Sequence, residues 1–173
     1  MVLEPNRRKL FEDCVSQCAD SVYRVSYRLT GHETLARDLV QETYLNAWKS
    51  LETLQDPEKL KSWMFAILRN QYSKMIRTES KAVASADVSD VPESQDSFGE
   101  DELSKKETAD QVQQAIQKLD EPFRLPVLLV SMEGMSVEEA AGVLDLPRGT
   151  VLSRLHRGRE KLKSILTREF ALA

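Results

Sequence analysis

Basic side chains crowd the segment PRGTVLSRLHRGREKLKS, residues 147–164, which carries six Arg and Lys residues against one Glu. A guanidinium can hold a phosphate or a guanine edge with two parallel hydrogen bonds, and an ammonium can neutralise a phosphate. These residue types therefore indicate binding to nucleic acid rather than bond chemistry. A solvated basic helix face is the alternative that composition alone leaves open.

The residues before this segment indicate how it is held. Ser136 stands three residues before Glu139, which is the spacing of a capping box at the start of a short helix. The tripeptide DLP then turns the chain, and a last helix begins near Pro147 to Thr150. This pattern is typical of a helix-turn-helix, whose second helix enters the major groove. It favours DNA over a solvated face, and the candidate contacts are Arg148, Thr150, Ser153, Arg154, His156, Arg157, Arg159 and Lys161.

A second basic segment lies earlier, in LKSWMFAILRNQYSKMIR, residues 60–77. From Lys61 to Arg77 it has four basic residues and no acidic ones. Cations that follow a phosphate backbone, with rings that stack on bases, suit single-stranded nucleic acid. A solvated helix with aromatic residues in the core explains the same composition equally well. The candidate contacts are Trp63, Arg69, Asn70, Tyr72, Lys74 and Arg77.

Acidic residues are concentrated between these two segments. The whole chain has a formal charge of −4, yet residues 81–110 contain nine acids and three bases. The rest of the chain is therefore slightly basic. Residues 81–106 are rich in Ser, Asp and Glu and poor in large apolar residues, which predicts a flexible acidic linker.

The apolar residues elsewhere recur at three- and four-residue steps, which predicts amphipathic helices. We expect one helix whose apolar stripe runs from Phe11 to Leu29 and that stops at Gly31, a second from about Glu33 to Leu54, and a third that starts at Asp56-Pro57. Six Gly and six Pro residues in 173 are too few for the many turns of an all-β fold. The expected fold is all-α, with two small helical domains at 6–80 and 107–170.

Several classes of protein are not expected. No apolar run approaches the ~20 residues of a membrane span, and the first residues have no apolar signal core. We therefore expect a cytoplasmic protein with no membrane contact of its own. The sequence shows no phosphate loop and no nucleophile elbow, so we expect no enzyme activity and no cofactor. Cys14 and Cys18 could bind metal or sense oxidants, but we favour two buried thiols.

Taken together, these segments resemble the extracytoplasmic-function sigma factors, over about residues 8–168. DLVQETYLNAWKSL, residues 38–51, looks like the family's helix that binds the clamp coiled coil of RNA polymerase. The segment around residues 63–77 looks like the one that melts and reads the minus-ten element. Residues 125–162 look like region four, which reads the minus-thirty-five element.

The resemblance implies a role for each part of the chain. Residues 6–80 would be region two, 81–106 the linker and 107–170 region four. The partners would be core RNA polymerase, through its clamp coiled coil and flap, promoter DNA as duplex and as melted non-template strand, and an anti-sigma factor. Leu152 departs from the family, because several members have a polar or basic base-reading residue there. The polymerase-docking residues would be Asp38, Gln41, Glu42, Asn46 and Trp48.

Two other functions remain possible from the residues alone. A stand-alone helix-turn-helix regulator would bind duplex DNA without polymerase, although such regulators usually dimerise. A helical adaptor would bind proteins only, but the clustered bases at 148–163 oppose this. Specific transcripts from purified chain and core polymerase would exclude both.

Overall fold

The computed structural model describes residues 4–83 and 100–170, and the side chains within 7–78 and 108–170. Both ranges are helical and contain no strand, which confirms the all-α prediction. No helix in these ranges is long and apolar enough to span a membrane. The longer helices are α1 (Glu4–Thr30), α2 (Glu33–Lys49), α3 (Leu60–Val83), α4 (Glu100–Lys118), α5 (Glu121–Val127), α6 (Val137–Leu144) and α7 (Arg148–Phe170).

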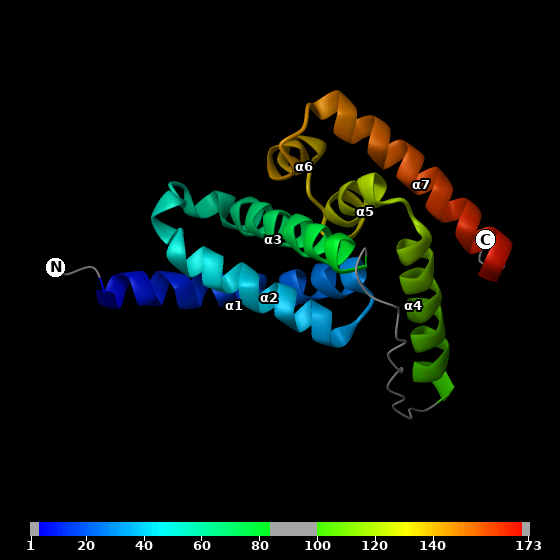
Figure 1. Cartoon of the computed structure of the whole chain (residues 1–173), viewed down its shortest axis with the longest axis horizontal. Helices are drawn as coiled ribbons and strands as arrows, with labels where there is room; N and C mark the ends of the chain where they lie inside the picture. The colour runs from blue at the N-terminus through cyan, green and yellow to red at the C-terminus, as the bar shows by residue number, and fades with distance from the viewer. Residues whose placement is uncertain (1–3, 84–99, 171–173) are drawn as a thin grey trace.

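The first three helices lie side by side, and α4 runs crosswise at one end of them (Figure 1). Gly31 ends α1 with φ of 73°, a left-handed conformation that glycine adopts without steric cost. Two short 3₁₀ turns, η1 (Leu51–Thr53) and η2 (Pro57–Lys59), join α2 to α3. The Asp56 carboxylate caps η2 by accepting a hydrogen bond of 3.0 Å from the Glu58 backbone N–H. The predicted helix start at Asp56-Pro57 is thus confirmed as this turn, and α3 follows directly.

The apolar stripes of α1, α2 and α3 meet in one core. Phe65, Met64, Leu39 and Leu29 are fully buried there. Cys14 and Cys18 are also buried, with exposed fractions of 1% and 3%. Burial raises the pKa of both thiols above the ordinary value. The prediction of two buried thiols is confirmed, and a raised pKa makes them poor nucleophiles at neutral pH.

The capping box predicted at the start of α6 is also confirmed. The Ser136 hydroxyl accepts from the Glu139 N–H at 3.1 Å, and the Glu139 carboxylate accepts from the Ser136 N–H at 2.8 Å. Asp145 ends α6 in the left-handed region, with φ of 52° and ψ of 49°. This residue makes the sharp turn that leads into α7.

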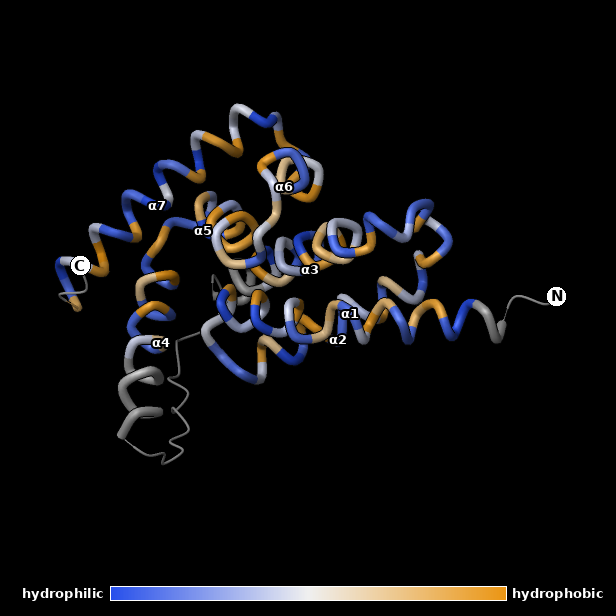
Figure 2. Tube along the Cα trace, turned by 180° about the vertical axis from the view of Figure 1, so that it is seen from behind, coloured by the Kyte–Doolittle hydropathy of each residue, from blue (hydrophilic) through white to orange (hydrophobic). Residues whose placement is uncertain are grey.

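Helices α5 and α7 are in unusually close contact. Gly158 is buried where the two helices cross, and a Cβ atom there would lie 2.7 Å from the Val127 Cγ2 atom and 3.2 Å from the Phe123 Cβ atom. Figure 2 shows hydrophobic and hydrophilic residues alternating along α7, as expected for a helix with one apolar side. Because glycine has no side chain, residue 158 allows α7 to approach α5 this closely.

One apolar cluster runs through both halves of the chain. It joins Val25 and Phe65 of the first half to Ile116, Leu129 and other residues of the second. The predicted linker at 81–106 lies mostly outside the described residues. Helix α3 extends to Val83, and α4 begins at Glu100.

We predict that Gly158→Ala lowers the free energy of unfolding by about 1–3 kcal/mol, because the added methyl group forces α5 and α7 apart. Urea denaturation would measure the effect. Gly142→Ala in α6 is the matched control, because no atom lies within 4 Å of its added Cβ. It should be neutral or stabilising by up to about 1 kcal/mol, since Ala has the higher helix propensity. Equal effects of the two changes would contradict the close contact at Gly158.

Candidate nucleic-acid interface

Helix α7 turns one side to the core and the other to solvent. Val151, Leu155 and Gly158 are buried against α5 and α6. The opposite side carries the residues predicted to contact DNA. Arg148, Ser153, His156, Arg157, Arg159 and Lys161 are exposed, and Thr150 and Arg154 are half-buried.

Some of these cations already have partners in the free chain. Arg148 pairs with Glu138, Lys161 pairs with Asp120, and the Arg159 Nε–H donates to the Ser131 hydroxyl at 3.0 Å. These are exposed contacts, which are worth little and are easily exchanged for a phosphate. Within the described residues, Arg154 and Arg157 have no hydrogen-bond or ion-pair partner. Their guanidinium groups can therefore bind a ligand without first breaking a contact to a described residue.

Leu152 lies on the same exposed side and has 46% of its surface accessible. It stands in the first turns of α7, the part of such a helix that meets base edges. A leucine there offers only an apolar contact, and in the major groove the thymine methyl group is the natural apolar partner.

Helix α3 carries the second set of predicted contacts. Asn70, Lys74 and Arg77 are exposed and lie along one side. Trp63 is half-buried, and its indole N–H donates to the Thr53 hydroxyl at 2.9 Å. The Arg69 Nε–H donates to the backbone carbonyl of Val143 in α6 at 3.1 Å. Arg69 is therefore occupied by the second half of the chain.

The placement of Tyr72 on this nucleic-acid face was wrong. Its side chain is 4% exposed, and its hydroxyl donates to the Leu29 carbonyl at 3.5 Å. Tyr72 lies four residues after Leu68 and eight after Met64, both of which are fully buried. It thus belongs to the apolar stripe of α3 and has no face to offer to a base in this structure.

The predicted docking residues of α2 divide into exposed and packed ones. Asp38, Gln41 and Glu42 are exposed. Asn46 is half-buried and its amide donates to the Glu42 carbonyl at 2.7 Å. Trp48 packs edge-on against Phe11, with 5.2 Å between the ring centroids, and the Arg7 guanidinium lies 4.9 Å from its ring.

A shallow apolar groove of about 460 Å³ adjoins these residues. Leu45 and Tyr44 line this groove, and neither was predicted from the sequence. Leu45 is 44% exposed although it is apolar, which is a feature of binding surfaces. Burial raises the pKa of Tyr44 to about 12, so its phenol stays neutral. The full lining is Phe11, Arg37, Val40, Gln41, Tyr44, Leu45 and Trp48.

Comparisons with known proteins agree with these surfaces. Residues 14–82 match the family Sigma-70 region 2, and residues 109–162 match Sigma-70, region 4. The chain is 31% identical to the ECF RNA polymerase sigma factor EcfG of Rhodopseudomonas palustris, covering 89% of this chain and 83% of that protein. It is 29% identical to SigW of Bacillus subtilis, covering 90% and 88%.

A third relative is longer. The chain is 34% identical to the ECF RNA polymerase sigma factor SigE of Mycolicibacterium smegmatis over 91% of this chain, but it spans only 62% of that protein. Among solved structures, the sigma factor RpoE of Bartonella quintana, in complex with the anti-sigma factor NepR, is similar with a TM-score of 0.76 and 25% identity. The match covers 92% of this chain and 98% of that one.

These similarities extend across both halves of the chain and agree with the helix-turn-helix and with the basic helix α3. Sigma factors take part in transcription initiation and are not enzymes. The chain belongs to the extracytoplasmic-function (ECF) sigma factors.

Proposed function

We propose that this chain binds core RNA polymerase in the cytoplasm and directs it to a specific set of promoters. The observation that carries the proposal is the exposed side of α7, where Arg154 and Arg157 have no partner among the described residues and α7 follows the capped helix α6. This helix would read the minus-thirty-five duplex, because its first turns can enter the major groove. Phosphate contacts would set its position and base contacts its specificity.

Helix α3 would act at the minus-ten element. Opening the duplex there costs a few kcal/mol for each unstacked base, which contacts to the flipped bases must offset. Asn70, Lys74 and Arg77 give α3 an exposed polar and basic side along which the non-template strand can lie. With Tyr72 in the core, base stacking would depend on Trp63, whose ring is half-buried.

Helix α2 would dock on the polymerase. Its exposed side combines the carboxylates of Asp38 and Glu42 with the apolar groove beside Leu45. A basic, amphipathic helix fits such a surface, because apolar side chains can fill the groove while cations meet the carboxylates. The clamp coiled coil of the polymerase, which the family resemblance implies as a partner, would lie on this surface. The polymerase flap is the second contact that the resemblance implies.

A regulatory partner is part of the same proposal. The sigma factor RpoE of Bartonella quintana was solved with the anti-sigma factor NepR, and CnrH, of TM-score 0.65 and 26% identity, with the cytosolic domain of CnrY. We propose an anti-sigma factor for this chain too. A transcription assay with purified chain, core polymerase and promoter DNA tests the main function, because a stand-alone regulator or an adaptor gives no specific transcripts.

We predict that Arg154→Ala and Arg157→Ala each weaken promoter use, since every lost base contact costs roughly 1–3 kcal/mol. The readout is transcript yield from a cognate promoter at fixed salt. Arg168→Ala is the control, because Arg168 is an exposed cation in the last turn of the same helix. Full transcription with both variants would show that α7 does not read the promoter as proposed.

Reversal of charge on α2 should block polymerase binding. Asp38→Arg combined with Glu42→Arg replaces two exposed carboxylates with cations that repel a basic partner. Co-purification with core enzyme is expected to be lost. The control, Asp13→Arg with Glu58→Arg, makes the same change of charge on exposed residues outside α2. Undiminished co-purification of the α2 variant would contradict the docking surface.

Leu152 should make the affinity of the chain for a minus-thirty-five duplex depend on one thymine methyl group. The test uses a minus-thirty-five duplex selected from a random pool, with each thymine replaced in turn by uracil, which lacks the methyl. One replacement should weaken binding of the unmodified chain about fourfold, from roughly 0.8 kcal/mol for the methyl group. Leu152→Ala should bind both duplexes equally. If no uracil affects the unmodified chain, Leu152 makes no such contact.

A further inference from the structure

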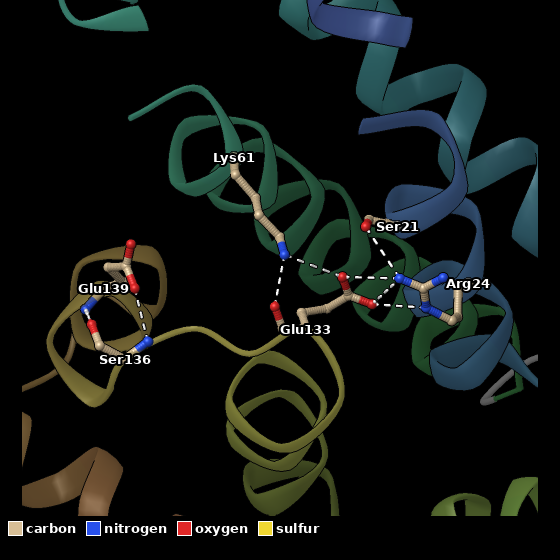
Figure 3. Close-up of polar contacts among 6 residues, drawn as sticks. All are labelled: Ser21, Arg24, Lys61, Glu133, Ser136 and Glu139. Atoms are coloured by element: carbon tan, nitrogen blue, oxygen red, sulfur yellow. Dashed lines mark hydrogen bonds and ion pairs between the residues drawn. The ribbon is translucent and has the colours of Figure 1, made fainter. Parts of the chain in front are cut away.

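Glu133 is the only charged residue that is buried within the described part of the chain. Its side chain is 1% exposed, and its partners come from the other half of the molecule (Figure 3). The Arg24 Nε–H donates to one carboxylate oxygen at 2.9 Å, and the Arg24 Nη2–H donates to the other at 3.2 Å. The Lys61 ammonium lies 3.5 Å from the carboxylate and donates to the Glu133 backbone carbonyl at 2.7 Å.

A local irregularity of the backbone places Glu133 at this position. Residues Leu128–Met132, labelled η3, form a π-helical turn after α5. The Glu133 N–H donates to the Leu128 carbonyl, five residues back, at 3.0 Å. Gly134 follows with φ of 68°, which breaks the helix. Turns of this kind are rare in proteins, and those that occur are often found at functional sites. This one ends at Glu133, whose carboxylate is directed at α1 and α3.

Two glutamines from α4 make a second polar contact between the halves. The last carbonyl groups of a helix have no partner within the helix. The Gln117 amide donates to the Arg28 carbonyl at 2.7 Å, and the Gln113 amide donates to the Tyr27 carbonyl at 3.2 Å. Arg28 in turn donates to the Ala109 carbonyl at 3.0 Å. Helix α4 thus caps α1 across the boundary between the two domains.

The third contact involves the helix that would meet single-stranded DNA. Arg69 binds the Val143 carbonyl of α6, and Lys61 binds Glu133. Both are cations of α3, and both hold oxygen atoms of region four. A carboxylate and two carbonyl groups are therefore bound where phosphate oxygens would otherwise be the natural ligands.

The closed arrangement is incompatible with reading both promoter elements at once. By their names, the minus-ten and minus-thirty-five elements lie about 25 base pairs apart, or roughly 85 Å along a duplex at ~3.4 Å per base pair. Here α6, which leads into the recognition helix, lies directly on α3, with 3.1 Å between Arg69 Nε and the Val143 carbonyl. The two halves must separate before α3 and α7 can each reach their element.

We propose that the side of α3 that carries Lys61 and Arg69 is a shared surface with two mutually exclusive occupants. In the free chain it binds residues 133–143 of region four, with Glu133 as the central contact. In the transcription complex it is released to promoter DNA. Only the second occupant, promoter DNA, rests on the proposed function, because the contact with region four is a property of the free chain.

The exposure of the two cations favours a contact that can open. Arg24 and Lys61 have side chains that are 47% and 44% exposed, so both become fully hydrated at little cost when the halves part. Glu133 regains water at the same time. A replacement that removes its charge leaves no buried cation without a partner, and therefore weakens the contact without damaging region two.

Small-angle X-ray scattering of the full chain, without polymerase or DNA, tests the first occupant. Glu133→Arg should raise the radius of gyration by several ångströms, because three cations then meet in one place. Glu133→Gln should lower the ratio of closed to open chain about tenfold, since a hydrogen bond to a charged group is lost. Arg24→Glu combined with Glu133→Arg should restore the compact form. Unfolding curves identify any variant that fails to fold, and Glu133→Gln, which keeps the shape of the side chain, then decides.

Glu138→Gln is the matched control, because Glu138 also forms an ion pair, with Arg148, but within region four and 63% exposed. It should leave the radius of gyration unchanged. An unmodified chain that is already expanded, or a Glu133→Arg chain that stays compact, would overturn the proposal.

A second readout separates this proposal from the proposed function. The affinity for a single-stranded oligonucleotide, whose minus-ten sequence is first selected from a random pool, should rise severalfold in Glu133→Gln and stay unchanged in Glu138→Gln. An expanded variant with unchanged affinity would show that region four does not compete with DNA, which also contradicts the shared surface. A different outcome would contradict the proposed function alone. In it, the unmodified chain is compact and the Glu133 variants open as described, but the unmodified chain yields no transcripts with core polymerase.

Discussion

Burial of Glu133 between Arg24 and Lys61 decides how the two halves of this chain lie against each other. A carboxylate that is 1% exposed is stable only with close cationic partners, and both partners belong to region two. The apolar cluster continues from one half into the other around this contact. The interface therefore combines non-directional apolar burial with one charged contact that fixes its geometry.

This arrangement treats the two helices proposed to bind nucleic acid differently. On α7 the side proposed to read the promoter remains open, with Arg154 and Arg157 free of partners among the described residues. On α3, Lys61 and Arg69 are occupied by region four, while Asn70, Lys74 and Arg77 stay exposed. A chain in this state could meet duplex DNA through α7, but its contacts to single-stranded DNA would be incomplete. Under the proposed function, this order would suit a factor that opens DNA only after it has bound the polymerase.

Much of the fold could be predicted because it depends on neighbours in sequence. The capping box at Ser136, the stop at Gly31 and the buried thiols were all predicted from local spacing and residue type, and the structure confirms them. Tyr72 was misplaced although the same spacing, Met64, Leu68 and Tyr72, puts it on the buried stripe. The basic residues around Tyr72 suggest a nucleic-acid face, but the helical period decides its position. Leu45 could not be predicted, because nothing in the sequence distinguishes one exposed leucine from the buried ones.

The helices, the helix-turn-helix and the sign of charge on each helix face follow from local sequence, because propensity, capping and periodicity act over a few residues. Which cations are free and which are covered depends on long-range packing. Glu133 and Arg24 are 109 residues apart, and no local pattern connects them. Their contact arises because the apolar sides of α3, α5 and α6 pack together and a π-helical turn directs one carboxylate across the boundary.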